Sequence, residues 1–103
     1  MNKPSPPKYL TAASKKVWES IVADYAMDEP ALEILAATLA ATDRMQQARA
    51  RINKDGVLQA DRFGVLRAHP LIAVERDASG CALRGWRLLN FAAPAAEPKE
   101  DDE

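Results

Sequence analysis

Apolar residues recur at helical spacing in three stretches of this chain, and turn signals separate the stretches. In the first stretch, charged residues occupy the faces that the apolar stripe leaves free. Thr11 can cap its start, which predicts a helix over about 11–26. The stripe consists of Val17, Trp18, Ile21, Val22 and Tyr25. We expect Trp18 to anchor a hydrophobic core, because its neighbours on the stripe are mainly aliphatic.

The second stretch predicts a long helix over about 29–54. Asp28 can cap it, and Glu29 and Pro30 suit its first turn. Its apolar seam rotates along the helix, from Leu32, Leu35 and Leu39 to Ala41, Met45, Ala48 and Ile52. A rotating seam favours contacts with more than one partner, among them other subunits.

The third stretch predicts a helix over about 70–90 that begins at Pro70. Its narrow seam consists of Leu71, Val74, Ala78, Cys81, Gly85 and Leu88, and Leu83, Trp86 and Leu89 form a second apolar edge. Cys81, the single cysteine, is expected to be a small core residue. Gly80 and Gly85 each cost a helix about 1 kcal/mol, which indicates close backbone approach. Two apolar edges suit a ring or bundle of subunits, and also a monomeric three-helix core.

The segment between the second and third helices predicts a short β-hairpin. The pairs Val57-Leu58 and Val65-Leu66 flank the turn-forming run 60–64. Asp61 is expected to bond its own backbone in this turn. His69 is expected to be fixed in extended conformation by Pro70, ahead of the helix. The expected fold is therefore mainly α, with three helices and one hairpin.

Both ends of the chain differ in composition from its centre. Residues 1–10 hold three prolines and two lysines, which predicts an extended basic arm. Residues 92–103 hold five acidic residues and one lysine, which predicts a disordered acidic tail. The expected folded domain is therefore 11–91. No run approaches the ~20 apolar residues of a membrane span, and the N-terminus lacks the apolar core of a signal peptide. We expect a soluble protein of a reducing compartment.

Charge divides unevenly along the chain. The net charge is −1, yet residues 44–87 carry nine Lys/Arg against four Asp/Glu. Such asymmetry is common where polyanions are handled, and it also fits a solvated surface with a solubilising tail. Cations at the end of the second helix are favoured by its dipole in any case. The candidate phosphate-contacting residues are Lys15, Lys16, Arg44, Arg49, Arg51, Lys54, Arg62 and Arg67. The last two would approach the others if the hairpin folds back.

Sequence motifs for catalysis are weak. Residues 80–85 have the glycine spacing of a phosphate-binding loop, but the lysine and hydroxyl residue that should follow are missing. One histidine and one cysteine cannot form a structural zinc site. Asp61 and His69 could form an acid–base pair, but the structural roles given above are simpler. We expect no enzyme activity, cofactor or metal.

The order of several short motifs resembles a known family. A start PPKYLT, a long helix, then DRFG, HP, an apolar pair and ERDA are similar to the small terminase subunits of tailed double-stranded DNA phages, in their short helical branch. The similarity covers roughly Pro6 to Leu89. It implies a subunit in the host cytoplasm that forms a ring of roughly eight to eleven copies and binds viral DNA. It further implies delivery of that DNA to the large terminase subunit, which carries the ATPase and nuclease.

Two other classes remain open. A helical adaptor that never touches nucleic acid fits the small net charge. A small DNA-binding regulator needs polar residues at the start of a recognition helix, where this chain has Leu71 to Val74. The acidic tail suits a basic surface on the large subunit or the portal, or it mimics DNA and keeps DNA off the basic domain.

Overall fold

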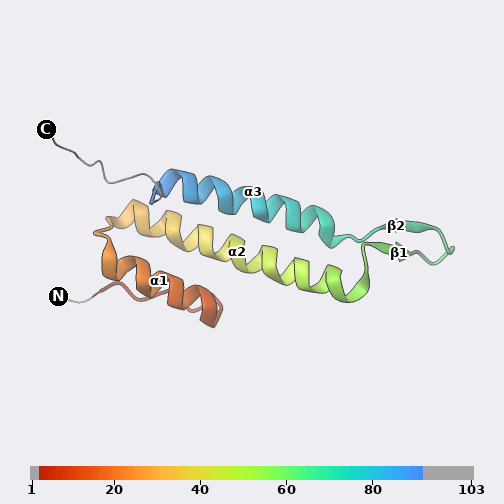
Figure 1. The fold of residues 1–103 in the computed structure, drawn as a ribbon, viewed down its shortest axis with the longest axis horizontal. Helices are drawn as coiled ribbons and strands as arrows, with labels where there is room; N and C mark the ends of the chain where they lie inside the picture. The colour runs from red at the N-terminus through yellow and green to blue at the C-terminus, as the bar shows by residue number, and fades with distance from the viewer. Residues whose placement is uncertain (1–2, 92–103) are drawn as a thin grey trace, which may run out of the picture.

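The computed structural model describes residues 3–91, which form three helices and a two-stranded hairpin (Figure 1). The elements in order are α1 (Ala12–Asp24), α2 (Glu29–Asp55), β1 (Leu58–Ala60), β2 (Leu66–Ala68) and α3 (Leu71–Leu89). The three predicted helices and the hairpin are confirmed, with helix ends within two residues of those expected. The predicted tail 92–103 lies outside the described residues.

Local capping explains where the first two helices begin. The Thr11 hydroxyl accepts a hydrogen bond from the Ser14 amide at 3.2 Å, and the Asp28 carboxylate accepts one from the Ala31 amide at 3.0 Å. Each bond satisfies an amide that has no partner within the helix. Both caps are the ones predicted from the sequence.

The core lies where α1 and the N-terminal half of α2 meet. Leu35 and Leu39 of α2 are almost fully buried beside Trp18 of α1 and Leu10. The prediction that Trp18 anchors the core is confirmed. Its indole nitrogen donates to the Pro4 carbonyl at 3.0 Å, so the N-terminal arm lies against its own helix.

Helices α2 and α3 run antiparallel along most of their length (Figure 1) and lie in close contact at Gly85. A Cβ atom built on Gly85 would stand 1.9 Å from the Thr38 hydroxyl oxygen, so only glycine fits there. Gly80 differs, because its Cβ would meet only the flexible end of the Arg84 side chain, at 3.3 Å. The predicted close approach is therefore confirmed at Gly85, and the helix backbone is not approached at Gly80.

The seam of α3 is rotated from the one predicted. Ala78 and Gly85 are buried as expected, but Cys81 is exposed and Leu88 is 71% exposed. The buried position between Ala78 and Gly85 is occupied by Ala82. The prediction of Cys81 as a core residue is wrong, because the buried position after Ala78 is four residues on, at Ala82, and not three residues on, and both spacings lie near the same side of a helix.

The turn of the hairpin is held by Asp61. Its carboxylate accepts bonds from the amides of Phe63 at 2.8 Å and Val65 at 3.0 Å, and Gly64 adopts φ +79°. This confirms Asp61 as a turn residue. The hairpin does not fold back on α2, however. It projects from the end of the helical pair (Figure 1), so β2 with Arg67 and the turn with Arg62 extend beyond the end of α2.

His69 joins the hairpin to both long helices. It is buried, its Nδ1 accepts from the Leu71 amide at 3.0 Å, and its Nε2 lies 3.0 Å from an Asp55 carboxylate oxygen. The hydrogen bond from His69, then that from Arg51, holds the pKa of Asp55 below its ordinary value. His69 therefore fixes the start of α3, as predicted, and its carboxylate partner is Asp55 instead of Asp61.

One carboxylate ties α1 to α2. Asp43 of α2 accepts hydrogen bonds from the Thr11 amide at 2.9 Å, the Thr11 hydroxyl at 2.7 Å and the Ser14 hydroxyl. These groups lie at the N-terminus of α1, where the helix dipole also favours a negative charge. Because α1 contacts the other helices much less than α2 and α3 contact each other, Asp43 is its main polar anchor.

Replacing Asp43 by asparagine should lower the free energy of unfolding by about 1 to 2 kcal/mol at neutral pH, because charge-assisted bonds are lost. Burial raises the pKa of Asp43, but the hydrogen bonds from Ser14 and Thr11 outweigh it and hold that pKa below its ordinary value of 3.8. A lowered folded-state pKa stabilises the protein above the unfolded-state value, and this contribution disappears as pH falls through the folded-state value.

Urea unfolding of wild type and Asp43→Asn at about pH 7 and about pH 3 checks this expectation. The difference between the two proteins should shrink at the lower pH. Asp77→Asn, at an exposed site, is the control and should be nearly neutral. A difference that is the same at both pH values would contradict the charged role of Asp43.

Candidate nucleic-acid interface

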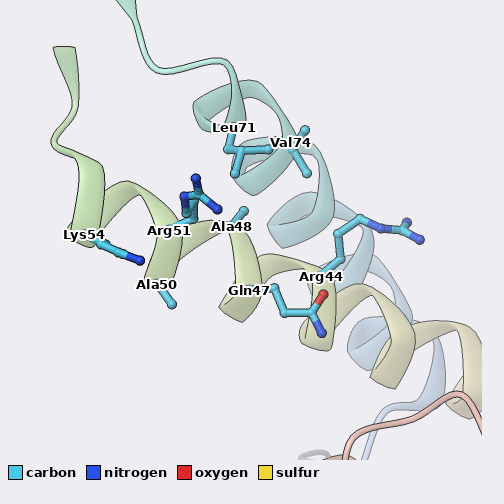
Figure 2. A pocket seen from close by; sticks show the side chains of 8 residues that line it. All are labelled: Arg44, Gln47, Ala48, Ala50, Arg51, Lys54, Leu71 and Val74. Carbon is cyan, nitrogen blue, oxygen red and sulfur yellow. The ribbon is translucent and has the colours of Figure 1, made fainter. Parts of the chain in front are cut away.

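A cleft of about 540 Å³ lies between the C-terminal half of α2 and the start of α3 (Figure 2). Positions three and four apart on α2 share one face, which is why its polar wall repeats at this spacing. The residues that line it are Arg44, Gln47, Ala48, Ala50, Arg51, Lys54, Leu71 and Val74. We call this the cationic cleft. Its floor is apolar, and its polar side chains are cationic or amide.

Two cations of the cleft are not neutralised by the described part of the chain. Within residues 3–91, no carboxylate oxygen lies within 4.0 Å of the charged nitrogens of Arg44 or Lys54. Arg51 is paired with Asp55 at 2.7 Å. Figure 2 shows Arg51 between Lys54 and Arg44 along α2. Both unpaired cations are exposed, and each could bind an external anion.

Arg49 has a structural contact within the chain. Its guanidinium lies 2.6 Å from the Glu75 carboxylate, which links α2 to α3. The pair is partly exposed, so its contribution to stability is small. It nevertheless lowers the local positive charge that Arg49 could offer to a ligand.

The remaining candidate cations lie elsewhere. Lys15 and Lys16 belong to α1, which runs beside the N-terminal half of α2 (Figure 1). On the hairpin, Arg67 pairs with Asp61 at 2.8 Å, and Arg62 lies over the Phe63 ring at 5.1 Å. The structure therefore gathers four of the eight candidates on the C-terminal half of α2 and spreads the others along the molecule.

A second groove continues along the same two helices. Its walls come from the middle of α2 and the C-terminal half of α3, and Arg44 borders both hollows. Its lining includes Ile34, Ala37, Ala41, Cys81, Gly85 and Leu88. We call this the alanine groove. Leu71 and Val74 of the predicted seam line the cationic cleft, whereas Trp86 packs against the core and near Phe91.

Sequence reasoning missed Arg84, which lines the alanine groove together with Arg44. The two residues are far apart in sequence, and only the antiparallel packing of α2 and α3 brings them to one surface. The small residue Gly85 was the available signal, because pairing it with a position on α2 would have set the register of the two helices.

The described residues hold no cluster of three or more His, Cys, Asp or Glu that could bind a metal ion. Among residues 3–91 there is also no helix long and apolar enough to cross a membrane. Comparison of the chain with protein-family models, curated proteins and solved structures gave no match.

Proposed function

We propose that this chain is a small terminase subunit that binds viral DNA, assembles as a ring and recruits or regulates the large ATPase and nuclease subunit in the host cytoplasm. The motif order from Pro6 to Leu89 supports the family. The observation that carries DNA binding is the pair of exposed, unneutralised cations on one face of α2, Arg44 and Lys54.

Their spacing suits a polyanion. Arg44 and Lys54 are ten positions apart on the helix, which is about 15 Å along the axis. At that distance the two side chains contact different phosphates of one duplex, not a single phosphate group. Arg44 can hold two phosphate oxygens at once, and Lys54 acts as a point charge.

Each such contact is weak, because water and salt screen exposed charges. Repetition around a ring solves this: every copy adds the same cations, and their contributions to the binding free energy sum. Contacts of this kind position DNA without reading bases. The chain would therefore bind DNA without sequence specificity through these contacts. Any specificity would come from DNA shape or from another component.

The adaptor alternative is favoured by a different observation. Five large apolar side chains of the hairpin region are at least half exposed, which is typical of a protein-binding surface. They are Val57, Leu58, Phe63, Val65 and Leu66. An adaptor would use this surface alone and leave DNA unbound.

Fluorescence anisotropy with a labelled duplex in about 50 mM salt separates the two functions. A DNA-binding subunit should bind with micromolar or tighter affinity and lose it on addition of salt. An adaptor would show no binding even at this low salt. That result would remove the proposed DNA-binding function.

A further inference from the structure

The hairpin has one face that is entirely apolar. Leu58 pairs with Ala68 and Ala60 with Leu66 across the two strands. Side chains two apart on a strand, and those directly opposite each other, point to the same side of a sheet. These four residues therefore form one face, and all four are exposed.

The opposite face of the hairpin already has partners within the chain. Gln59 donates to the Asp55 carbonyl at 3.1 Å, and Arg67 pairs with Asp61 at 2.8 Å. One face is therefore formed by four apolar side chains, whereas the opposite face combines the partnered polar side chains of Gln59 and Arg67 with the exposed Val65. A two-stranded hairpin alone in water is marginal, and an apolar sheet face is normally covered by a second layer.

Within residues 3–91, no other element covers this face of the hairpin. The hairpin projects along the long axis from one end of the α2–α3 pair (Figure 1). The alanine groove, an exposed apolar hollow of about 500 Å³, lies farther along that pair, toward the other end of the molecule. Alanine and other small residues form much of its lining, Leu88 at 71% exposure adds a large apolar side chain, and Arg44 and Arg84 border it. A leucine-bearing ribbon fits such a groove on another molecule.

We propose that the apolar face of the hairpin, through Leu58 and Leu66, docks in the alanine groove of a second copy of this chain. The contact is heterologous, because two different surfaces meet, and each copy can therefore donate a hairpin and accept one. Repeated contacts of this kind close into a ring when the rotation per copy allows it.

The area involved supports two contacts per copy. The hairpin face with Phe63 exposes on the order of 400 Å² of apolar surface, well below the roughly 800 Å² per partner of a standard interface. A lone pair of copies would be held weakly. A copy that uses its hairpin and its groove at once buries about twice as much, which favours closed assemblies over isolated dimers.

Cys81 supplies a direct assay, since it is the single cysteine of the chain, is exposed and lines the alanine groove. Its alkylation rate by a thiol reagent is measured without DNA across protein concentrations, alongside sedimentation velocity. Docking should slow the alkylation of wild type at least tenfold as the assembly forms. Leu58→Ser/Leu66→Ser should stay monomeric and be alkylated at the rate of dilute wild type.

Val65→Ser is the matched control, because it removes an exposed apolar side chain from the opposite face of the same hairpin. It should assemble and protect Cys81 like wild type, and circular dichroism should show unchanged helix content in every variant.

A monomeric wild type at all concentrations would overturn the proposal, as would equal assembly of the double variant or assembly that leaves Cys81 reactive. The docking contact itself does not depend on the proposed function; only the role of the resulting ring in DNA packaging rests on it. Both assays omit DNA, so failure of the docking contact is distinguishable from failure of DNA binding.

Discussion

Replacing Gly85 by alanine should lower the free energy of unfolding by about 2 to 3 kcal/mol, although alanine ordinarily stabilises a helix relative to glycine. The added methyl group would stand 1.9 Å from the Thr38 hydroxyl oxygen and 2.9 Å from its Cβ. Thr38 is 2% exposed, and its hydroxyl donates to the Ile34 carbonyl at 2.6 Å, so it cannot move aside. Helices α2 and α3 must separate instead.

Gly80→Ala is the matched control on the same helix. Its methyl group would meet only the Arg84 guanidinium, a flexible group on an exposed side chain. This substitution should be neutral or stabilising by up to about 1 kcal/mol, as expected from helix propensity. Denaturant unfolding measures both variants. If both substitutions changed the free energy of unfolding equally, backbone entropy and not the packing of α2 against α3 would determine their effect.

A third variant locates the clash. Thr38→Ala removes the two atoms that lie at 1.9 Å and 3.1 Å from the added methyl group. Thr38→Ala/Gly85→Ala should therefore be more stable than the sum of the two single changes predicts, by about 1 kcal/mol or more. Strict additivity would contradict direct contact between these positions.

Arg44→Glu/Lys54→Glu should weaken binding to duplex DNA on the order of a hundredfold in low salt. Each reversal would remove a proposed phosphate contact and introduce a repulsive charge at the cationic cleft. Both positions are exposed on α2, so the thermal unfolding temperature should change little. Anisotropy titration with the same duplex as for wild type gives the affinity.

Arg76→Glu controls for net charge. Arg76 is exposed on α3, lies 3.6 Å from Asp77 and does not line the cationic cleft. Its reversal changes the overall charge by the same amount per site and should weaken binding only a few-fold. If Arg76→Glu and each single reversal in the cleft weakened binding equally, DNA would be held by diffuse charge and not at the cleft.

Much of the fold could be predicted because its signals are local. Thr11, Asp28 and Pro70 mark helix starts through bonds and dihedral angles within one turn, and Asp61 defines the hairpin turn within five residues. These interactions involve neighbours in sequence, so the sequence displays them. The predicted helices and hairpin follow from them directly.

What could not be predicted depends on rotation or on distant partners. Cys81 and Ala82 both continue the apolar repeat from Ala78, at three and four residues, and only the packing of α3 on α2 makes Ala82 buried and Cys81 exposed. Asp43 meets Thr11 across 32 positions of sequence. The direction of the hairpin depends on its junctions, where His69 bonds Asp55, so Arg62 and Arg67 could not be placed beforehand.

The candidate site was predicted in part for the same reason. Arg44, Arg51 and Lys54 share a face of one helix, which spacing alone indicates. Asp55 pairs with Arg51 one turn along the same helix, but Glu75 reaches the neighbouring Arg49 from α3 only in the folded chain. The net charge of this part of the sequence therefore overstates the number of cations that are free to bind an external anion.

The salt dependence of DNA affinity tests the central claim, binding by Arg44 and Lys54, most directly. The slope of log K against log salt reports the number of phosphates that the protein neutralises. Arg44→Gln/Lys54→Gln should have a shallower slope than wild type, by about 1.8 for each copy in contact with DNA. Wild type and variant with the same slope would contradict the claim, even if their affinities differ.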